Sequence, residues 1–149
     1  MSITTTRRPR TPVRRFGYVV AVLVNLTLAW LIAVWPGWDV VPFLTEETTE
    51  VLPFVYASIA TGVLVNLVYV ADDRPAVKAT GELVNALVGF VSVIRTWHVF
   101  PFDLDGQWVG WEWLIYVALA VGAFGTAIGA IVQVVTLVRI ASGQQGQRL

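Results

Sequence analysis

Residues 51–75 read VLPFVYASIATGVLVNLVYVADDRP, and this stretch decides the fold. The run 51–71 carries no charged side chain. As a helix rising about 1.5 Å per residue, it can cross a hydrocarbon core of about 30 Å. Asp72-Asp73-Arg74-Pro75 follows at once, and another apolar segment begins at Ala76. A connection this short places the two helices antiparallel, so the stretch predicts a transmembrane hairpin.

Three more apolar segments surround that run, and we expect spans at about 17–35, 51–71, 76–100 and 112–140. Apolar residues make up 56% of the chain, against about 45–50% in soluble domains, and the mean hydropathy is +0.70. The alternative for the first segment is a cleaved signal peptide, whose apolar part is shorter, roughly 7–15 residues. The sequence predicts an all-α fold, a transmembrane four-helix bundle of two antiparallel hairpins.

The charges are divided between the two sides of these spans. Nine of the ten Lys and Arg residues lie near the termini or the 72–75 turn, whereas the loops 36–50 and 101–111 contain none. Basic flanks remain in the cytoplasm, so we expect cytoplasmic termini and a multi-pass protein of the plasma membrane. Residues 1–16 are expected to form a disordered basic cytoplasmic arm and residues 141–149 a flexible cytoplasmic tail. The arm could also contact anionic lipid.

Each span carries a strongly polar residue at a similar depth, roughly 8–13 Å from its cytoplasmic end at the helical rise. These residues form the predicted polar layer: Asn25, Asn66, Glu82, Asn85 and Gln133. In hydrocarbon such groups need partners, and the nearest are one another. One reading is interhelical hydrogen bonding that holds a compact bundle together. The other is a polar vestibule that contacts a small solute.

Small residues recur at four-residue spacing beside these polar residues, and positions four apart share a helix face. The fourth span provides the plainest example, with Gly122, Gly125 and Gly129. Small faces allow helix backbones to approach closely. We expect these three glycines to serve helix packing, with the stripes inward and the Val, Leu and Ile faces toward lipid.

Glu82 is the sharpest single candidate, because a carboxylate within a membrane span indicates function by default. Lys78 lies four residues earlier on the same helix face and could pair with it. The alternatives are therefore a structural ion pair and a titrating or cation-contacting role.

A second group of candidates lies toward the outer side: Arg95, His98, Asp103 and Asp105. We expect an ion pair between Arg95 and an outer carboxylate, with an anion or lipid headgroup as the alternative. His98 is expected to be a hydrogen-bonded interface residue rather than a ligand. Asp103 and Asp105 match only part of a calcium-loop pattern, so no metal site is predicted.

The residue inventory argues against most enzyme classes. The chain has no cysteine and only one histidine, which excludes thiolate chemistry and multi-histidine metal sites within one chain. No nucleophile–base set or phosphate-binding loop is present. We expect no enzyme activity, no cofactor and no nucleic-acid partner.

The outer loops contain distinctive strings: PFLTE at 42–46, VFPFD at 99–103 and WPGW at 35–38. With these strings the chain resembles small four-span membrane proteins of unassigned function from high-GC actinobacteria. The resemblance implies a bacterial plasma-membrane protein of four helices and brings no activity with it. The Pro-Phe pair common to both loops also admits an internal duplication.

The leading functional expectation is a non-enzymatic accessory or scaffold subunit that acts through helix packing and its aromatic outer loops. Its expected partners are the lipid bilayer and either itself or a larger membrane protein complex. The alternative is an oligomeric channel or carrier for a small ion or polar solute, which would use the polar layer.

Overall fold

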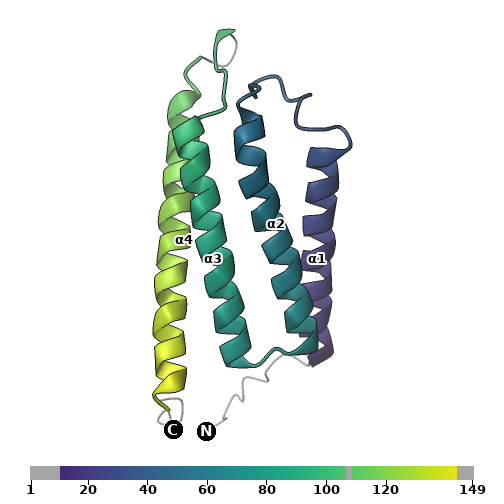
Figure 1. Ribbon diagram of the computed structural model, residues 1–149, viewed down its shortest axis with the longest axis vertical. Helices are drawn as coiled ribbons and strands as arrows, with labels where there is room; N and C mark the ends of the chain where they lie inside the picture. The colour runs from purple at the N-terminus through teal and green to yellow at the C-terminus, as the bar shows by residue number, and fades with distance from the viewer. Residues whose placement is uncertain (1–10, 107–108, 144–149) are drawn as a thin grey trace, which may run out of the picture.

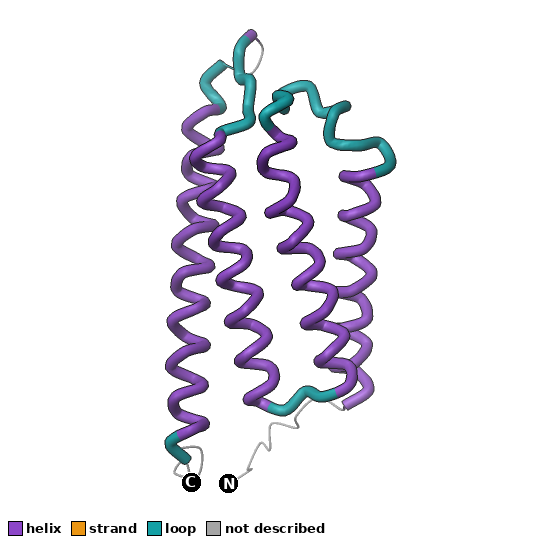
Figure 2. The backbone as a smooth tube through the Cα atoms, in the orientation of Figure 1, coloured by secondary structure: helices purple, strands orange, loops and turns teal. Residues whose placement is uncertain are grey.

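The computed structural model describes residues 11–106 and 109–143, which form four helices (Figure 1). These are α1 (Thr11–Ala33), α2 (Thr48–Ala71), α3 (Pro75–Val99) and α4 (Glu112–Ala141). Figure 2 shows helices joined by loops, with no strand in the described ranges. All four are long and apolar enough to cross a membrane. The all-helical fold is therefore confirmed, and its four candidate spans fit a helix bundle.

The first helix begins earlier than the sequence suggested. α1 starts at Thr11, so residues 11–16 are helical rather than part of a disordered arm. An ion pair accompanies this extension, because Arg14 Nη2 lies 3.0 Å from Asp73 Oδ2 in the α2–α3 turn. The rest of the expected arm, residues 1–10, and most of the expected tail, residues 144–149, lie outside the described part of the chain.

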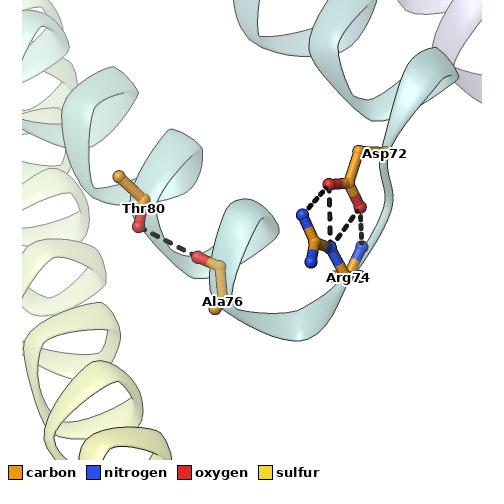
Figure 3. A network of polar contacts seen from close by, with 4 residues as sticks. All are labelled: Asp72, Arg74, Ala76 and Thr80. Atoms are coloured by element: carbon orange, nitrogen blue, oxygen red, sulfur yellow. Dashed lines mark hydrogen bonds and ion pairs between the residues drawn. The ribbon is translucent and has the colours of Figure 1, made fainter.

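The short turn between α2 and α3 is held by its own side chains (Figure 3). The backbone N–H and the guanidinium of Arg74 both donate to the carboxylate of Asp72. These bonds hold the pKa of the Asp72 carboxyl below its usual range. Pro75 opens α3, where a missing N–H costs little. Thr80 closes the first turns of that helix by donating to Ala76 O at 2.9 Å.

The four helices are arranged in chain order, and successive helices run in alternating directions (Figure 1). α1 packs on α2, α2 on α3, and α3 on α4, whereas the described residues give no packing between α1 and α4. The compact interior expected from the small-residue stripes is therefore absent. The helices form an open row, and its two edges remain unpaired.

Burial is correspondingly sparse. The buried apolar residues of the described chain are Val22, Val51, Tyr69, Ala79 and Leu104, and α4 contains no buried residue. Valines and leucines remain exposed along all four helices. In water such a surface would be unfavourable, but in hydrocarbon an apolar side chain facing lipid costs nothing comparable.

At the end of the row opposite the α2–α3 turn, the two longer loops lie next to each other (Figure 2). An antiparallel bridge joins Leu44 to Phe102. Thr45 N donates to Pro101 O at 3.1 Å, and Asp103 N donates to Phe43 O at 2.9 Å. The two Pro-Phe strings therefore lie against each other, which ties the first half of the chain to the second.

The opposite end is held by a tyrosine. Tyr69 on α2 is 4% exposed, and its hydroxyl donates to Lys78 O on α3 at 2.8 Å. The close approach depends on Gly81, because a Cβ there would lie 2.5 Å from Tyr69 Oη and 2.9 Å from Val65 Cγ1. Tyr18 of α1 packs on the same ring, with 5.3 Å between centroids.

Candidate functional site: a polar groove across the four helices

The row encloses a groove of about 480 Å³ on one face. All four helices contribute to its lining, which combines polar side chains with small ones. The lining residues are Asn25, Ser58, Ile59, Gly62, Asn66, Glu82, Asn85, Ala86, Gly89, Gly125, Thr126 and Gly129. The groove therefore gathers four of the five residues of the predicted polar layer, and Gln133 binds at its edge through Glu82.

Glu82 has two partners. Gln133 Nε2 on α4 donates to its Oε2 at 2.5 Å, and Lys78 Nζ lies 3.8 Å from its Oε1. The first contact links α3 to α4, and the second lies within α3. Lys78 also sits 5.9 Å from the centre of the Tyr18 ring on α1, so the charged end of the groove reaches three helices.

The asparagines behave differently from the expectation that they would bond to one another. Asn25 Nδ2 donates to Ala21 O at 2.8 Å, and Asn66 Nδ2 donates to Gly62 O at 2.7 Å. Both bonds lie within a single helix. The side chain of Asn85 is exposed and makes no hydrogen bond within the described chain. Gln133–Glu82 is the one polar-layer bond between helices in the described ranges.

The glycines also divide into two kinds. A Cβ at Gly122 would lie 3.5 Å from Val93 Cγ2, and one at Gly129 would lie 3.9 Å from the Cβ of Ala86. These two positions face α3, as helix packing requires. Gly125 is exposed and has nothing within 4 Å of such a Cβ. It therefore lines open space in the groove instead of serving packing within the chain.

The floor of the groove is shaped by glycine at two further positions. A Cβ at Gly62 would approach Asn25 Oδ1 to 3.0 Å, so this glycine makes room for the asparagine of α1. A Cβ at Gly89 would lie 3.5 Å from Thr126 Cγ2 on α4. The lack of a side chain at Gly62 therefore lets α1 bring a polar group close to the floor, whereas Gly89 faces the methyl group of Thr126 at an ordinary contact distance.

An apolar crevice of about 410 Å³ lies on the other face of α2 and α3. Its lining includes Leu64, Val68, Ala76 and Val77. Lipid tails can fill such a surface without loss, because they are as apolar as its side chains. The polar groove differs in this respect, because lipid tails cannot hydrogen-bond to its amides.

The outer candidates lie apart from the groove. Arg95 Nη2 donates to Glu50 Oε2 at 2.7 Å. Glu50 is therefore the carboxylate with which Arg95 forms the expected ion pair. The guanidinium also lies 5.9 Å from the centre of the Phe54 ring. This ion pair joins α2 to α3 at the end of the row that carries the paired loops.

His98, Asp103 and Asp105 form no common site. His98 Nδ1 lies 2.8 Å from Ile94 O, one turn earlier in α3. Asp103 Oδ1 accepts from Asp105 N at 3.1 Å, which shapes the loop. In residues 11–106 and 109–143, no three His, Cys, Asp or Glu residues lie close enough to hold a metal ion.

Three contributors were missed when the sequence was read for site residues. Ser58 and Thr126 lie on small-residue stripes and line the groove, and their four-residue spacing from Gly62 and Gly122 was the available signal. Tyr69 packs on Gly81, and nothing in its local sequence indicates this contact. That contact depends on how α2 and α3 pack.

No family model, curated protein or solved structure matches this chain. The groove must therefore be interpreted from its own chemistry.

Proposed function

We propose that this chain is a non-enzymatic accessory or scaffold subunit whose polar groove receives a transmembrane segment of a larger membrane protein complex. The observation that carries the proposal is the open edge of the row. α1 and α4 do not pack on each other in the described chain, and the groove between them is lined by amides and glycines.

The physics of the bilayer supports this reading. A polar group that faces hydrocarbon lacks the hydrogen bonds that water would supply, and each such group is costly. Asn85 is exposed in the groove. Gly125 leaves open space beside α4, and helices approach most closely over small residues. A packed helix would cover the amides and use the space.

The orientation and the membrane belong to the same proposal. Arg14 and Arg74 lie at the end of the row that carries the α2–α3 turn, and Arg139 lies in the last turn of α4. The positive-inside rule assigns such an end to the cytoplasm. We propose cytoplasmic termini, a bacterial plasma membrane and two antiparallel hairpins, with the paired loops outside.

One observation favours a second function, an oligomeric channel or carrier. A carrier requires a polar cavity that water can enter, whereas a scaffold requires only a dry, hydrogen-bonded layer. The groove is open and contains Glu82. Several copies arranged around it could form a conduit for a small ion or polar solute, in which Glu82 would contact the solute.

Native mass spectrometry of the protein, extracted gently from its own membrane, tests the proposal. A stoichiometric complex with a larger membrane protein is expected. The Gly125→Leu variant should lose that partner, because a Cβ at Gly125 meets nothing within 4 Å and the rest of the leucine side chain extends into the groove that Gly125 lines. A homo-oligomer without another protein would contradict the scaffold function and favour the carrier. Glu82→Gln would then be expected to abolish cation-coupled flux.

A further inference from the structure

The hydrogen-bonding groups of the groove are unbalanced. Ser58 Oγ donates to Phe54 O at 3.0 Å, and Thr126 Oγ1 donates to Gly122 O at 2.9 Å. A hydroxyl has one proton to donate. Both hydroxyls therefore already donate their proton to the backbone of their own helix, so toward the groove they can only accept hydrogen bonds.

The amides add to this imbalance. Asn25 and Asn66 each direct Nδ2 to a backbone carbonyl of their own helix. A carbonyl only accepts, so the nitrogen must face it, and each Oδ1 keeps its full acceptor capacity. Gln133 spends an N–H on Glu82. An ionised carboxylate also only accepts. Each of these amides keeps one N–H, and Asn85 keeps two. The free oxygen positions of the hydroxyls, amides and carboxylate still outnumber these donors.

An occupant that satisfies this surface must supply donors. A second copy placed groove to groove would supply too few, because it would bring the same surplus of acceptors and set one Glu82 carboxylate against the other. Like groups in contact at low dielectric are unfavourable. Lys has three donors and no acceptor, and Gln has two donors on its amide. Such side chains complement the groove.

The structure also favours entry from the side. Tyr18 lies seven residues before Asn25 and so on the same face of α1. Lys78 Nζ on α3 approaches the Tyr18 ring to 5.9 Å, and this contact crosses from α3 to α1 near the α2–α3 turn. The edge between α1 and α4 has no such crossing in the described chain. A group that reaches the groove through this edge must come from within the bilayer.

We infer that the occupant is a transmembrane helix of another protein that presents a hydrogen-bond-donating side chain, basic or amide, at the depth of Asn66 and Asn85. This inference rests on the proposed scaffold function and adds the chemistry by which the partner is recognised. The donor side chain binds the free amide oxygens of the groove, and the backbone of the partner helix packs against Gly125.

Synthetic transmembrane peptides in lipid vesicles test the chemistry directly. Three peptides share a Leu/Ala helix and differ at one central position, which is Lys, Gln or Leu. The chain has no cysteine, so a single Ser142→Cys change accepts a fluorescent donor for energy transfer to a labelled peptide. The Lys and Gln peptides are expected to bind the full-length protein roughly tenfold more tightly than the Leu peptide, as one or two interhelical hydrogen bonds allow.

Two protein variants locate the binding. Gly125→Leu should abolish the preference for the Lys peptide by filling the groove. Gly17→Leu is the matched control, because a Cβ at Gly17 also meets nothing within 4 Å and Gly17 is not among the lining residues of the groove. Asn85→Leu should reduce the preference at least threefold without unfolding the chain, since the Asn85 side chain makes no hydrogen bond in the described structure.

Equal binding of all three peptides would overturn the donor inference and leave helix docking in place. Binding that survives Gly125→Leu would place the partner helix on another surface. If labelled copies of the protein associate with one another and Gly125→Leu prevents it, the occupant is a second copy and the inference is wrong. A partner found by native mass spectrometry together with no binding of any peptide would also contradict it, while the scaffold function would stand.

Discussion

The ends of the helical row and its middle are built in opposite ways. At one end the loops pair through Leu44 and Phe102, and at the other, beside the α2–α3 turn, Tyr69 donates to Lys78 O. In the middle, the asparagines bond only within their own helices. The polar groups at the ends hold neighbouring helices together, whereas those in the middle remain available. Contacts between neighbouring helices thus stabilise both ends of the row, whereas the asparagines of the groove between them make no bond to another helix.

Glycine-to-alanine substitutions, one at an end of the row and one in its middle, should differ most in their effect on the free energy of unfolding. Gly81→Ala should lower the free energy of unfolding by about 1–3 kcal/mol, because the new Cβ overlaps Tyr69 and Val65. Gly125→Ala should be neutral or stabilising by up to about 1 kcal/mol, since alanine favours a helix and nothing lies within 4 Å. Unfolding in SDS–detergent mixtures, followed by circular dichroism, measures both. Similar losses in the two variants would refute the contrast.

The hydrogen bond between Gln133 and Glu82 is the exception in the middle, and its removal sharpens the comparison. Gln133→Leu should cost about 0.6–2 kcal/mol, the range of interhelical hydrogen bonds in membranes. Val132→Leu is the control, because Val132 is exposed on the same helix. A double-mutant cycle with Glu82→Leu isolates the pair, and a coupling energy near zero would show that this bond does not join α3 to α4.

At the end with the paired loops, the ion pair of Arg95 and Glu50 should contribute less to the free energy of unfolding. The two side chains are 40% and 57% exposed, and exposed pairs contribute about 0.2–1 kcal/mol. Arg95→Leu should therefore lower the free energy of unfolding by no more than about 1 kcal/mol. In 1 M salt the free energies of unfolding of the wild type and the variant should become more similar. A loss larger than that of Gly81→Ala would mean that the end with the paired loops depends on this charge.

The smallest effect is expected in the α2–α3 turn. The Arg74 guanidinium lowers the pKa of the Asp72 carboxyl, so the folded state binds a proton there less readily than the unfolded state. The contribution is present above the unfolded pKa, about 3.9, and is lost as the pH falls through the lower folded value. Asp72→Asn should slightly flatten the pH dependence of the free energy of unfolding between about pH 2 and 5. At pH 7 the variant should lose only the small contribution of this hydrogen-bonded pair. An unchanged acid profile would contradict this assignment.

Much of the fold could be predicted from sequence because the bilayer imposes simple rules. Uncharged runs such as 51–71 must be helical to satisfy their backbone groups in hydrocarbon, and the structure has α2 at Thr48–Ala71. The depth of Asn25, Asn66, Glu82 and Asn85 followed from counting residues, and these four line one groove.

The packing could not be predicted in the same way. Four-residue spacing shows that small residues share a face, but it does not say whether another helix covers that face. Gly129 is covered by α3, and Gly125, four residues earlier, is open. Likewise, an asparagine can bond to another helix or to its own backbone. Asn25 reaches Ala21 O, a choice that depends on the distance to the next helix.

The order of the helices has a consequence for how the chain is made. Each helix packs only on its predecessor and successor in the described chain, so each can dock as soon as it enters the membrane during synthesis. Local contacts of this kind form quickly. The loop pairing at Leu44 and Phe102 is the exception, because it joins segments that are synthesised at different times. Gly125 lies on the last helix, so the groove is complete, and could receive the proposed partner helix, only when synthesis of α4 ends.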